Sequence, residues 1–303
     1  MSERPLMVGL GELLWDLLPS GKRLGGAPAN FAYMATMLGD EGIVASRVGS
    51  DELGHEARNV MREHGLSSTY VQIDDQHDTG TAGVLLDSGG QPKFAIKEPV
   101  AWDFLEWTPA WEELSGRADV VCYGSLAQRS AVSANSIESF LRNLPKAALC
   151  ICDANLREPF YSMDVLTRSF RHANIVKVNN DELQRISAMM KMGAQDDEAI
   201  ARTLMSEFDL KLVCITRGKR GSLLVSQNNT ADHAGFDVKV ADAVGAGDAF
   251  TACLAHYFIL GKTLEEISER ANRFGSWVAT QVGATPLIHA AQLQAILGES
   301  ALS

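Results

Sequence analysis

Short apolar runs alternate with longer helical patterns along most of this chain of 303 residues. The short runs predict buried strands, because they contain too few residues for a packed helix. Strands are predicted at residues 6–10, 43–48, 119–123, 149–152, 174–178 and 211–215. Helices are predicted at 29–38, 52–64, 134–144, 181–190, 197–208, 249–260 and 264–282. This alternation indicates an α/β fold with a central, mainly parallel sheet that is flanked by helices.

From residue 69 to 98 the pattern changes to successive strands with no room for helices between them. Strands are predicted at 70–73, 83–86 and 93–96, with Asp87-Ser88-Gly89-Gly90 as a hairpin turn. We expect a small β-sheet that projects from the main body and is joined by the segment 13–24, within a single domain over 1–303. Such a sheet could be a lid that excludes water from a reaction, a hairpin without function or a homodimer surface.

The composition excludes several classes of protein. Hydrophobic residues make up 46% of the chain, which is ample for a large core. The formal charge of −11 argues against a nucleic-acid partner or a membrane surface, since both need clustered basic residues. No apolar run approaches the roughly 20 residues that span a bilayer, and the first residues lack the pattern of a signal peptide, so we expect a cytoplasmic protein. All five cysteines lie in apolar segments, which predicts reduced core thiols.

Polar residues follow directly after most of the predicted strands. The carboxyl ends of parallel strands are where ligands bind, so these residues are candidates for one common site. They are Gly11, Glu12 and Asp16, then Gly124, Ser125 and Gln128, then Asp153, Asn155 and Arg157, then Asn179 and Glu182, and finally Thr216, Arg217 and Gly218. Loops favour such residues for their own reasons, so the pattern supports a site more than it supports any one member.

The segment Asp242-Ala243-Val244-Gly245-Ala246-Gly247-Asp248 runs directly into an apolar helical pattern. Its small residues allow a tight turn, so that the backbone N–H groups of 245–247 can converge on an anion at the start of a helix. An aspartate beside such a site would repel a phosphate unless it took part in chemistry, so we interpret Asp248 as a general base. The alternative is that Asp248 is an ordinary helix N-cap. The chemical interpretation predicts phosphoryl transfer to an alcohol.

A second informative segment is Gly25-Gly26-Ala27-Pro28-Ala29-Asn30. Adjacent glycines permit close approach of a polyol, and the amide of Asn30 can donate to and accept from its hydroxyls. The alternative is a hinge followed by a proline at a helix start. Two other nucleotide-binding motifs are incomplete in this sequence. Gly9-Leu10-Gly11 lacks the third glycine of a dinucleotide fingerprint, and Gly261-Lys262-Thr263 lacks the earlier glycine of a P-loop.

Together, the early segment 25–30 and the late segment 242–248 resemble the two signatures of the ribokinase-like (PfkB) carbohydrate kinases, and they occur in the same order. The resemblance covers nearly the whole chain and extends to 153–157, to the N-x-x-E pattern of 179–182 and to 216–221. Within the family the chain is most similar to the fructokinases, through 11–16, 99–103 and 124–129. Two departures are Ala243, where the family usually has Thr or Ser, and Ala27-Pro28, where ribokinase has Lys-Gly, which weakens a ribose assignment.

The resemblance implies a ribokinase-like three-layer sandwich with a β-sheet lid, and an enzyme that uses ATP and Mg²⁺, with K⁺ as a further option. It implies a phosphate hole at Gly245, Ala246 and Gly247 with Asp248 as base, and sugar contacts from Asp16, Gly25, Gly26, Asn30, Gln128, Asn155 and Arg157. Asn179, Thr216, Gly218, Gly221 and Asn272 would border the nucleotide, Glu182 would hold Mg²⁺ through water, and Asp242, Val244 and Gly283 would form a monovalent-cation site.

The substrate stays open at this stage. Fructose, phosphorylated to fructose 6-phosphate, is favoured, while 2-keto-3-deoxygluconate, aminoimidazole riboside and ribose are alternatives. A non-catalytic sugar or nucleotide sensor on the same fold is an alternative of a different class, because a fold does not fix an activity. Asp248 and Glu182 argue against a sensor, which has no need of a base facing a phosphate.

Overall fold

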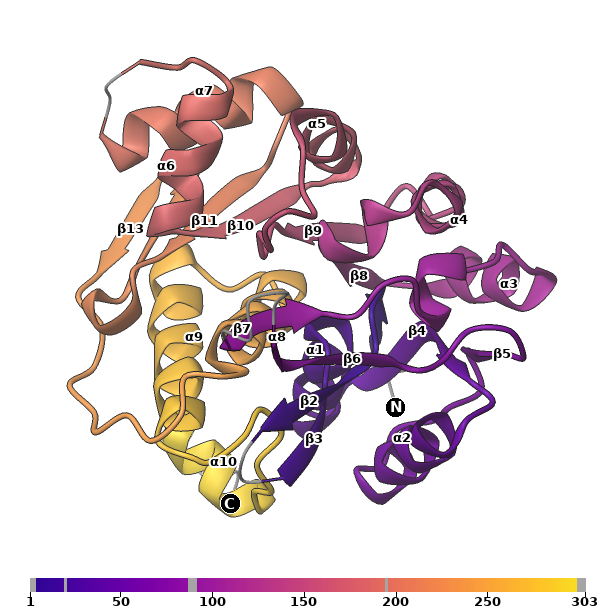
Figure 1. The fold of residues 1–303 in the computed structure, drawn as a ribbon. Helices are drawn as coiled ribbons and strands as arrows, with labels where there is room; N and C mark the ends of the chain where they lie inside the picture. Colours follow the sequence, from indigo (N-terminus) through magenta and orange to yellow (C-terminus); the bar gives the residue numbers. More distant parts are fainter. Residues whose placement is uncertain (1–3, 19–20, 87–91, 194–195, 299–303) are drawn as a thin grey trace.

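The computed structural model describes residues 4–18, 21–86, 92–193 and 196–298. Its main feature is a nine-stranded sheet with the order β13-β12-β11-β10-β9-β8-β1-β4-β5 (Figure 1). In chain order these strands are β1 (Leu6–Leu10), β4 (Glu41–Gly49), β5 (Val71–Asp74), β8 (Val120–Tyr123), β9 (Leu149–Asp153), β10 (Ile175–Asn179), β11 (Leu212–Thr216), β12 (Ser222–Ser226) and β13 (Thr230–His233). The pairs from β5 to β11 are parallel, and β12 and β13 add antiparallel pairs at one edge.

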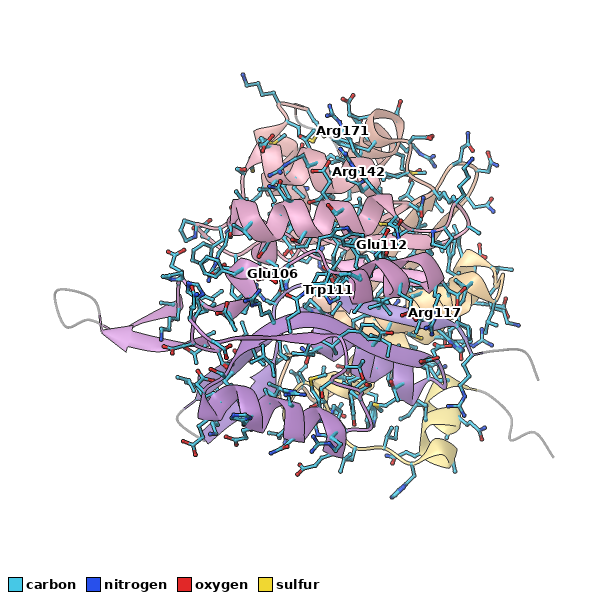
Figure 2. All side chains as sticks on the ribbon, turned by 90° about the vertical axis from the view of Figure 1, so that its right-hand side faces the viewer. Glu106, Trp111, Glu112, Arg117, Arg142 and Arg171 are labelled. Atoms are coloured by element: carbon cyan, nitrogen blue, oxygen red, sulfur yellow. The ribbon has the colours of Figure 1, made fainter. Side chains whose placement is uncertain are left out.

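Helices cover both faces of this sheet, which gives the three layers that the sequence predicted (Figure 1). One face packs against α3 (Pro109–Arg117), α4 (Ala131–Arg142), α5 (Met163–His172), α6 (Asn180–Met189) and α7 (Asp197–Phe208). The other packs against α1 (Ala27–Met37), α2 (Glu52–Glu63), α8 (Ala246–Ile259), α9 (Leu264–Ala279) and α10 (Ala290–Leu297). Trp111 of α3 is buried against the edge of Phe140, whereas Arg117 and Arg142 lie on the outer surface of this layer (Figure 2).

The strands read as continuous apolar runs because each of them contributes to two cores. In β1, Leu6, Val8 and Leu10 belong to the core under α3–α7, while Met7 belongs to the core under α1 and α8. Successive strand residues point to opposite faces, so a sheet covered on both sides has no polar face. This explains why the central strands were predictable from short apolar runs alone.

A separate four-stranded sheet has the order β3-β2-β6-β7, with β2 (Leu14–Leu18), β3 (Gly21–Gly25), β6 (Gly80–Leu86) and β7 (Pro92–Ile96). The segment 13–24 supplies two of its strands, as expected. The prediction that 70–73 belongs to this sheet is wrong: β5 pairs with β4 at the edge of the main sheet, and Val71 is buried in the main core. The predicted hairpin turn at 87–90 lies outside the described residues.

Other differences concern short or terminal elements. No element was predicted at α3, α5, α10, β12 or β13, and α8 begins at Ala246, three residues before its predicted start at 249. Among the described residues, no helix is both long and apolar enough to cross a membrane.

Candidate active site

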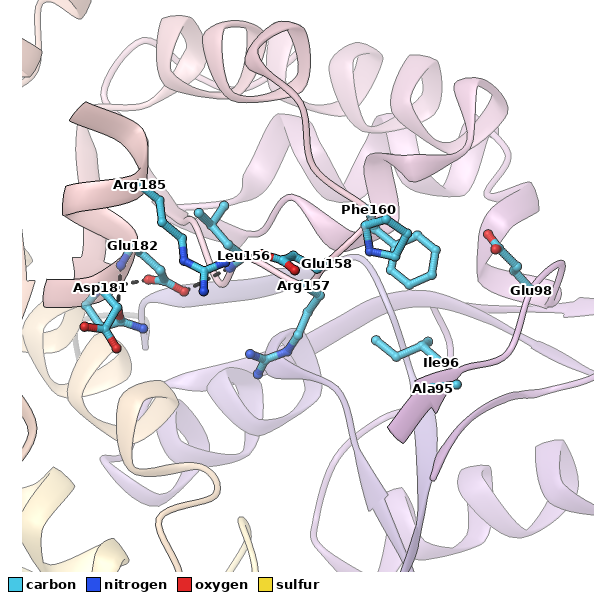
Figure 3. Close-up of a pocket in the computed structure, with 12 residues that line it drawn as sticks. Ala95, Ile96, Glu98, Leu156, Arg157, Glu158, Phe160, Asp181, Glu182 and Arg185 are labelled. Carbon is cyan, nitrogen blue, oxygen red and sulfur yellow. Dashed lines mark hydrogen bonds and ion pairs between the residues drawn. The ribbon is translucent and has the colours of Figure 1, made fainter. Parts of the chain in front are cut away.

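Three cavities meet at the carboxyl ends of the parallel strands. The central cavity has a volume of about 700 Å³, and Asp16, Asn30, Arg157 and Asp248 are among its lining residues. The outer cavity, of about 680 Å³, lies between β11, α8 and α9. The side cavity, of about 540 Å³, lies between β7 and the start of α6 (Figure 3). Gly247 lines both the central and the outer cavity, so two ligands placed in them would meet at the start of α8.

The start of α8 is an anion site built by the turn 242–248. Its N-cap is Gly245, with φ of 80° and no side-chain cap, so the first N–H groups of the helix have no intrahelical acceptor. Ala246 N–H donates to Ala243 O over 3.3 Å, which leaves Gly247 and Asp248 as the better placed backbone donors. Asp248 is the third residue of the helix, so the alternative that it is an N-cap is wrong. The positive ends of the backbone dipoles therefore converge where a phosphate would bind.

Asp248 faces the central cavity, where Asn30 Nδ2 donates to its Oδ2 over 2.7 Å. Burial, helped by the carboxylate of Asp153, raises the pKa of Asp248 to about 6. The hydrogen bond from Asn30 and the charges of Lys177 and Arg157 oppose this rise in pKa. A carboxylate with such a pKa is ionised at neutral pH and is also a competent proton acceptor.

Two residues of the site, Lys177 on β10 and Thr251 on α8, were not predicted from the sequence. Lys177 Nζ pairs with both oxygens of Asp153, at 2.9 and 3.1 Å, and Thr251 Oγ1 donates to Asp153 Oδ2 over 3.1 Å. Lys177 Nζ also lies 3.0 Å from the position that a Cβ on Gly247 would occupy. Burial disfavours the charged form of Lys177, but neighbouring carboxylates outweigh it and raise its pKa above the usual range. A lone lysine inside the apolar strand Ile-Val-Lys-Val was the signal that could have found it.

Most of the predicted sugar residues lie around the central cavity. Gly26, Asn155 and Arg157 line it, as does Asp16, whose pKa burial raises while Arg157 lowers it. Gly25 lies behind Asp16, since a Cβ on Gly25 would come within 2.6 Å of Asp16 Oδ2. Gln128 is not brought to the site.

The side chain of Gln128 points into the core below η2 (Leu126–Arg129). Its Nε2 donates to Gly124 O over 2.9 Å and to Ser169 Oγ over 2.8 Å, and it is 7% exposed. Both amide hydrogens are therefore used inside the protein. The structure contradicts the expectation that Gln128 contacts the sugar.

The predicted nucleotide residues line the outer cavity: Asn179, Thr216, Gly218, Gly221 and Asn272. Gly221 has a φ of 77°, and a Cβ there would lie 2.0 Å from His233 O, so only glycine fits this turn. Asn272 Nδ2 donates to Ser222 Oγ and Ser268 O, over 2.8 and 2.7 Å. Asn272 therefore has only its amide oxygen to offer a ligand in this cavity.

Glu182 and Asn179 form a capping box at the start of α6, beside the side cavity (Figure 3). Glu182 Oε1 accepts from Leu156 N over 2.9 Å and Oε2 accepts from Asn179 N over 2.8 Å. The part of the chain that the structure describes holds no group of three or more His, Cys, Asp or Glu residues that could hold a metal directly. Each oxygen of Glu182 keeps a second lone pair, so the donor set fits a hydrated Mg²⁺ held through water.

The structure brings Asp242, Val244 and Gly283 together at the mouth of the central cavity. Asp242 Oδ1 accepts from Val244 N over 3.0 Å, and Oδ2 accepts from Gly283 N over 3.2 Å. Arg23 Nη1 of β3 lies 3.3 Å from Asp242 Oδ2. The carboxylate thus ties the small sheet to this loop, and the second lone pair of Oδ1 is the donor that it could offer a monovalent cation.

The model of the pfkB family of carbohydrate kinases matches residues 20–291. The chain belongs to this family. It is 30% identical to a fructokinase of Escherichia coli, with 91% of this chain and 93% of the relative covered. A fructokinase of Vibrio cholerae, solved with fructose, ADP and potassium ion, is 25% identical, has a TM-score of 0.80 and covers 98% of this chain and 100% of its own. A ribokinase of Thermotoga maritima, 19% identical, has a TM-score of 0.78 over 98% of this chain and 100% of its own, which confirms the ribokinase-like fold.

Family membership confirms two predictions from the sequence: the resemblance to carbohydrate kinases and the class of reaction. The protein is a phosphotransferase that acts on a sugar.

Proposed function

We propose that the protein is an ATP-dependent fructokinase, which transfers the γ-phosphoryl group of ATP to the 6-hydroxyl of fructose. The observation that carries the proposal is the placement of Asp248. It faces the central cavity from the first turn of α8, one residue from Gly247, which also borders the outer cavity. An acceptor in the central cavity and a nucleotide in the outer cavity would therefore present their reacting groups to the same base and the same backbone donors.

The named relatives support fructose as the acceptor and ATP as the donor. The Escherichia coli relative is a fructokinase, and the Vibrio cholerae structure holds fructose, ADP and potassium. The intact base at Asp248 favours an enzyme over a sugar sensor. Ala27 and Pro28, in place of the Lys-Gly of ribokinase, favour fructose over ribose.

In the mechanism that this geometry supports, the 6-hydroxyl proton passes to Asp248 as its oxygen attacks the γ-phosphorus. The bond from the γ-phosphorus to its bridging oxygen breaks, and ADP leaves. The first-turn N–H groups of α8 and the ammonium of Lys177 stabilise the charge on the transferred group. Preorganised donors of this kind are worth about 3–4 kcal/mol each when water is excluded. A hydrated Mg²⁺ beside Glu182 and Asn179 would neutralise phosphate charge when bound.

The remaining residues then divide between the two substrates. Asp16, Gly26, Asn30, Asn155 and Arg157 hold the sugar, with Gly25 allowing Asp16 its position. Thr216, Gly218, Gly221 and the amide oxygen of Asn272 border the nucleotide, and Asp242, Val244 and Gly283 hold K⁺.

Two features of the whole protein also belong to the proposal. The five cysteines are all buried and form no disulfide, which supports a reducing compartment such as the cytoplasm. Leu17 and Leu18 of the small sheet are 42% and 38% exposed, which supports a homodimer formed through this sheet. A single-subunit mass in light scattering would rule the dimer out.

The test is ADP release from MgATP with a panel of sugars, with and without K⁺. Fructose is expected to give the highest kcat/KM, with fructose 6-phosphate as the product. If 2-keto-3-deoxygluconate, aminoimidazole riboside or ribose turns over and fructose does not, the acceptor is wrong while the kinase assignment stands. If no sugar stimulates ADP release but fructose or ATP still binds, the sensor alternative is correct.

A further inference from the structure

A buried carboxyl that the mechanism above does not use lies beside the base. Glu12 follows β1, is 2% exposed and lines the central cavity together with Asp248. Its Oε2 is buried and has no hydrogen-bond partner among the described residues. An ionised carboxylate is far more costly to bury without hydrogen-bond donors than a neutral carboxyl is. The geometry therefore favours the neutral acid at this position.

Glu12 also holds the start of α1. Ala27, the first residue of the helix, directs its N–H toward the carboxyl of Glu12, and this N–H lowers the pKa of that carboxyl. The N-cap, Gly26, offers no side chain, so Glu12 supplies from a distance the acceptor that a capping residue would provide. In the same turn, Asn30 N–H donates to Gly26 O over 3.0 Å, and Asn30 Nδ2 reaches Asp248 Oδ2. A fixed first turn of α1 therefore fixes Asn30, the residue that orients the base Asp248.

The charge of Glu12 matters because of what surrounds it. The groups that share its cavity are Asp16 on β2, Arg23 on β3, Asp153 on β9, Arg157 after β9, Lys177 on β10, Asp242 before α8 and Asp248 on α8. Burial, helped by the charge of Asp248, raises the pKa of Glu12 to about 7, although two backbone N–H groups and Arg157 oppose the rise. Arg157 is the cation of this set that lowers the pKa of Glu12, and its charge is shared with Asp16 and Asp248.

We propose that Glu12 is a positioning residue of the acceptor site that works as a neutral acid. It holds the first turn of α1, and thereby Asn30 against Asp248, without adding a second negative charge beside the base. When Glu12 ionises, this added charge opposes the approach of the phosphate and weakens the placement of the acceptor. The inference rests on the proposed function, because it assigns the alkaline limit of that reaction to one residue.

The test compares Glu12→Gln and Glu12→Ala with the wild-type enzyme, as kcat for fructose between about pH 5 and 9. The wild type is expected to gain activity through about pH 6, as Asp248 loses its proton, and to lose activity above about pH 7, as Glu12 ionises. Gln keeps an acceptor for Ala27 and a permanent donor, so this variant should keep the acid limb and lose the alkaline limb. Ala lacks both groups, and its kcat should fall at least about 10-fold at every pH.

Two results would overturn the inference: an alkaline limb that stays at the same pH in the Gln variant, or an Ala variant with wild-type kcat. Glu113→Gln is the matched control, because Glu113 is an exposed carboxyl paired with Arg117 on α3. Its pH profile should match that of the wild type.

A second readout needs no turnover. The pKa of Glu12 is raised in the folded protein, from 4.5 to about 7, so the folded state binds more protons across this window. Glu12 should therefore contribute a fall in wild-type stability as the pH rises from 4.5 to about 7, and the melting temperature of Glu12→Gln should lack this contribution while it keeps the fall caused by Asp248. Equal pH dependence of the two melting temperatures would overturn the neutral acid even if the protein phosphorylated no sugar. Conversely, an inactive wild type would remove the proposed function and leave this measurement intact.

Discussion

At the scale of single residues, Asp248 connects stability with activity. Its pKa is raised from 3.8 to about 6, so the folded protein loses stability as the pH rises through this window. Asp248→Asn removes that cost, so the free energy of unfolding near pH 7.5 should rise by about 1–2 kcal/mol. This is less than the whole rise in the pKa corresponds to, because Asp248 keeps some contact with solvent. The loss of the base should lower kcat at least about 100-fold. Urea unfolding and fructose turnover measure the two effects.

Asp232→Asn is a suitable control for that prediction, since Asp232 is an exposed partner of Arg217 and lines none of the three cavities. It should change neither quantity much. Near-normal turnover in Asp248→Asn would remove Asp248 from the mechanism, whatever happened to stability.

Residues within local signatures were predictable, while those that depend on register were not. Asp248 and Asn30 each lie in a short segment whose small residues already indicate a helix start. Lys177 belongs to the site because β10 pairs with β9, which places it opposite Asp153. Gln128 has the right residue type after a strand, but the 3-10 turn that follows β8 directs it to Ser169. Neither register nor turn direction is encoded in the local pattern.

At the scale of elements, the turn before α8 depends on Gly245. Its φ is 80°, and a Cβ would lie 2.6 Å from Ala284 Cα. Gly245→Ala should cost about 1–2 kcal/mol for the left-handed backbone alone, and more for the contact with Ala284. The shifted turn should also weaken ADP binding and lower kcat.

Gly261→Ala is the matched control at the other end of α8. Gly261 has a φ of 70° and nothing within 4 Å of the added Cβ, so it should lose only the backbone contribution. Unfolding free energies and ADP affinities of the two variants separate strain from function. Equal losses of stability, with ADP affinity kept in both, would show that the turn is not a phosphate site.

The elements themselves were predictable to the extent that burial leaves a pattern in the sequence. The central parallel strands are apolar on both faces, so their runs stand out, whereas α3 and α5 are short helices with charged outer faces. β5 was predicted as a strand but assigned to the wrong sheet. Its pattern is the same whichever partner it has, and the pairing with β4 is a tertiary contact that only the fold specifies.

At the scale of the whole molecule, Arg129 on η2 ties the small sheet to the body. Its Nε and Nη2 donate to the two oxygens of Asp103 over 2.7 and 2.8 Å, and Nη2 also donates to Lys97 O, just after β7, over 2.7 Å. The guanidinium lies 3.9 Å from the ring centre of Trp102 and 4.6 Å from that of Phe160. Its side chain is 5% exposed. The planar guanidinium of Arg129 therefore fixes the chain where it leaves β7 and the small sheet.

Arg129→Lys keeps the charge and loses both the fork and the stacking, so it tests whether the small sheet is a lid. The free energy of unfolding should fall by about 2–3 kcal/mol, because the substitution breaks the buried pair with Asp103 while the lysine keeps one hydrogen bond to it. A sheet that is less firmly held would admit water to the transferred phosphoryl group, so ADP should form in excess of fructose 6-phosphate. Arg117→Lys, on the exposed side of α3, should keep the wild-type ratio of the two products. If Arg129→Lys is destabilised but still forms one ADP per fructose 6-phosphate, the tie is structural and the small sheet does not exclude water from the reaction.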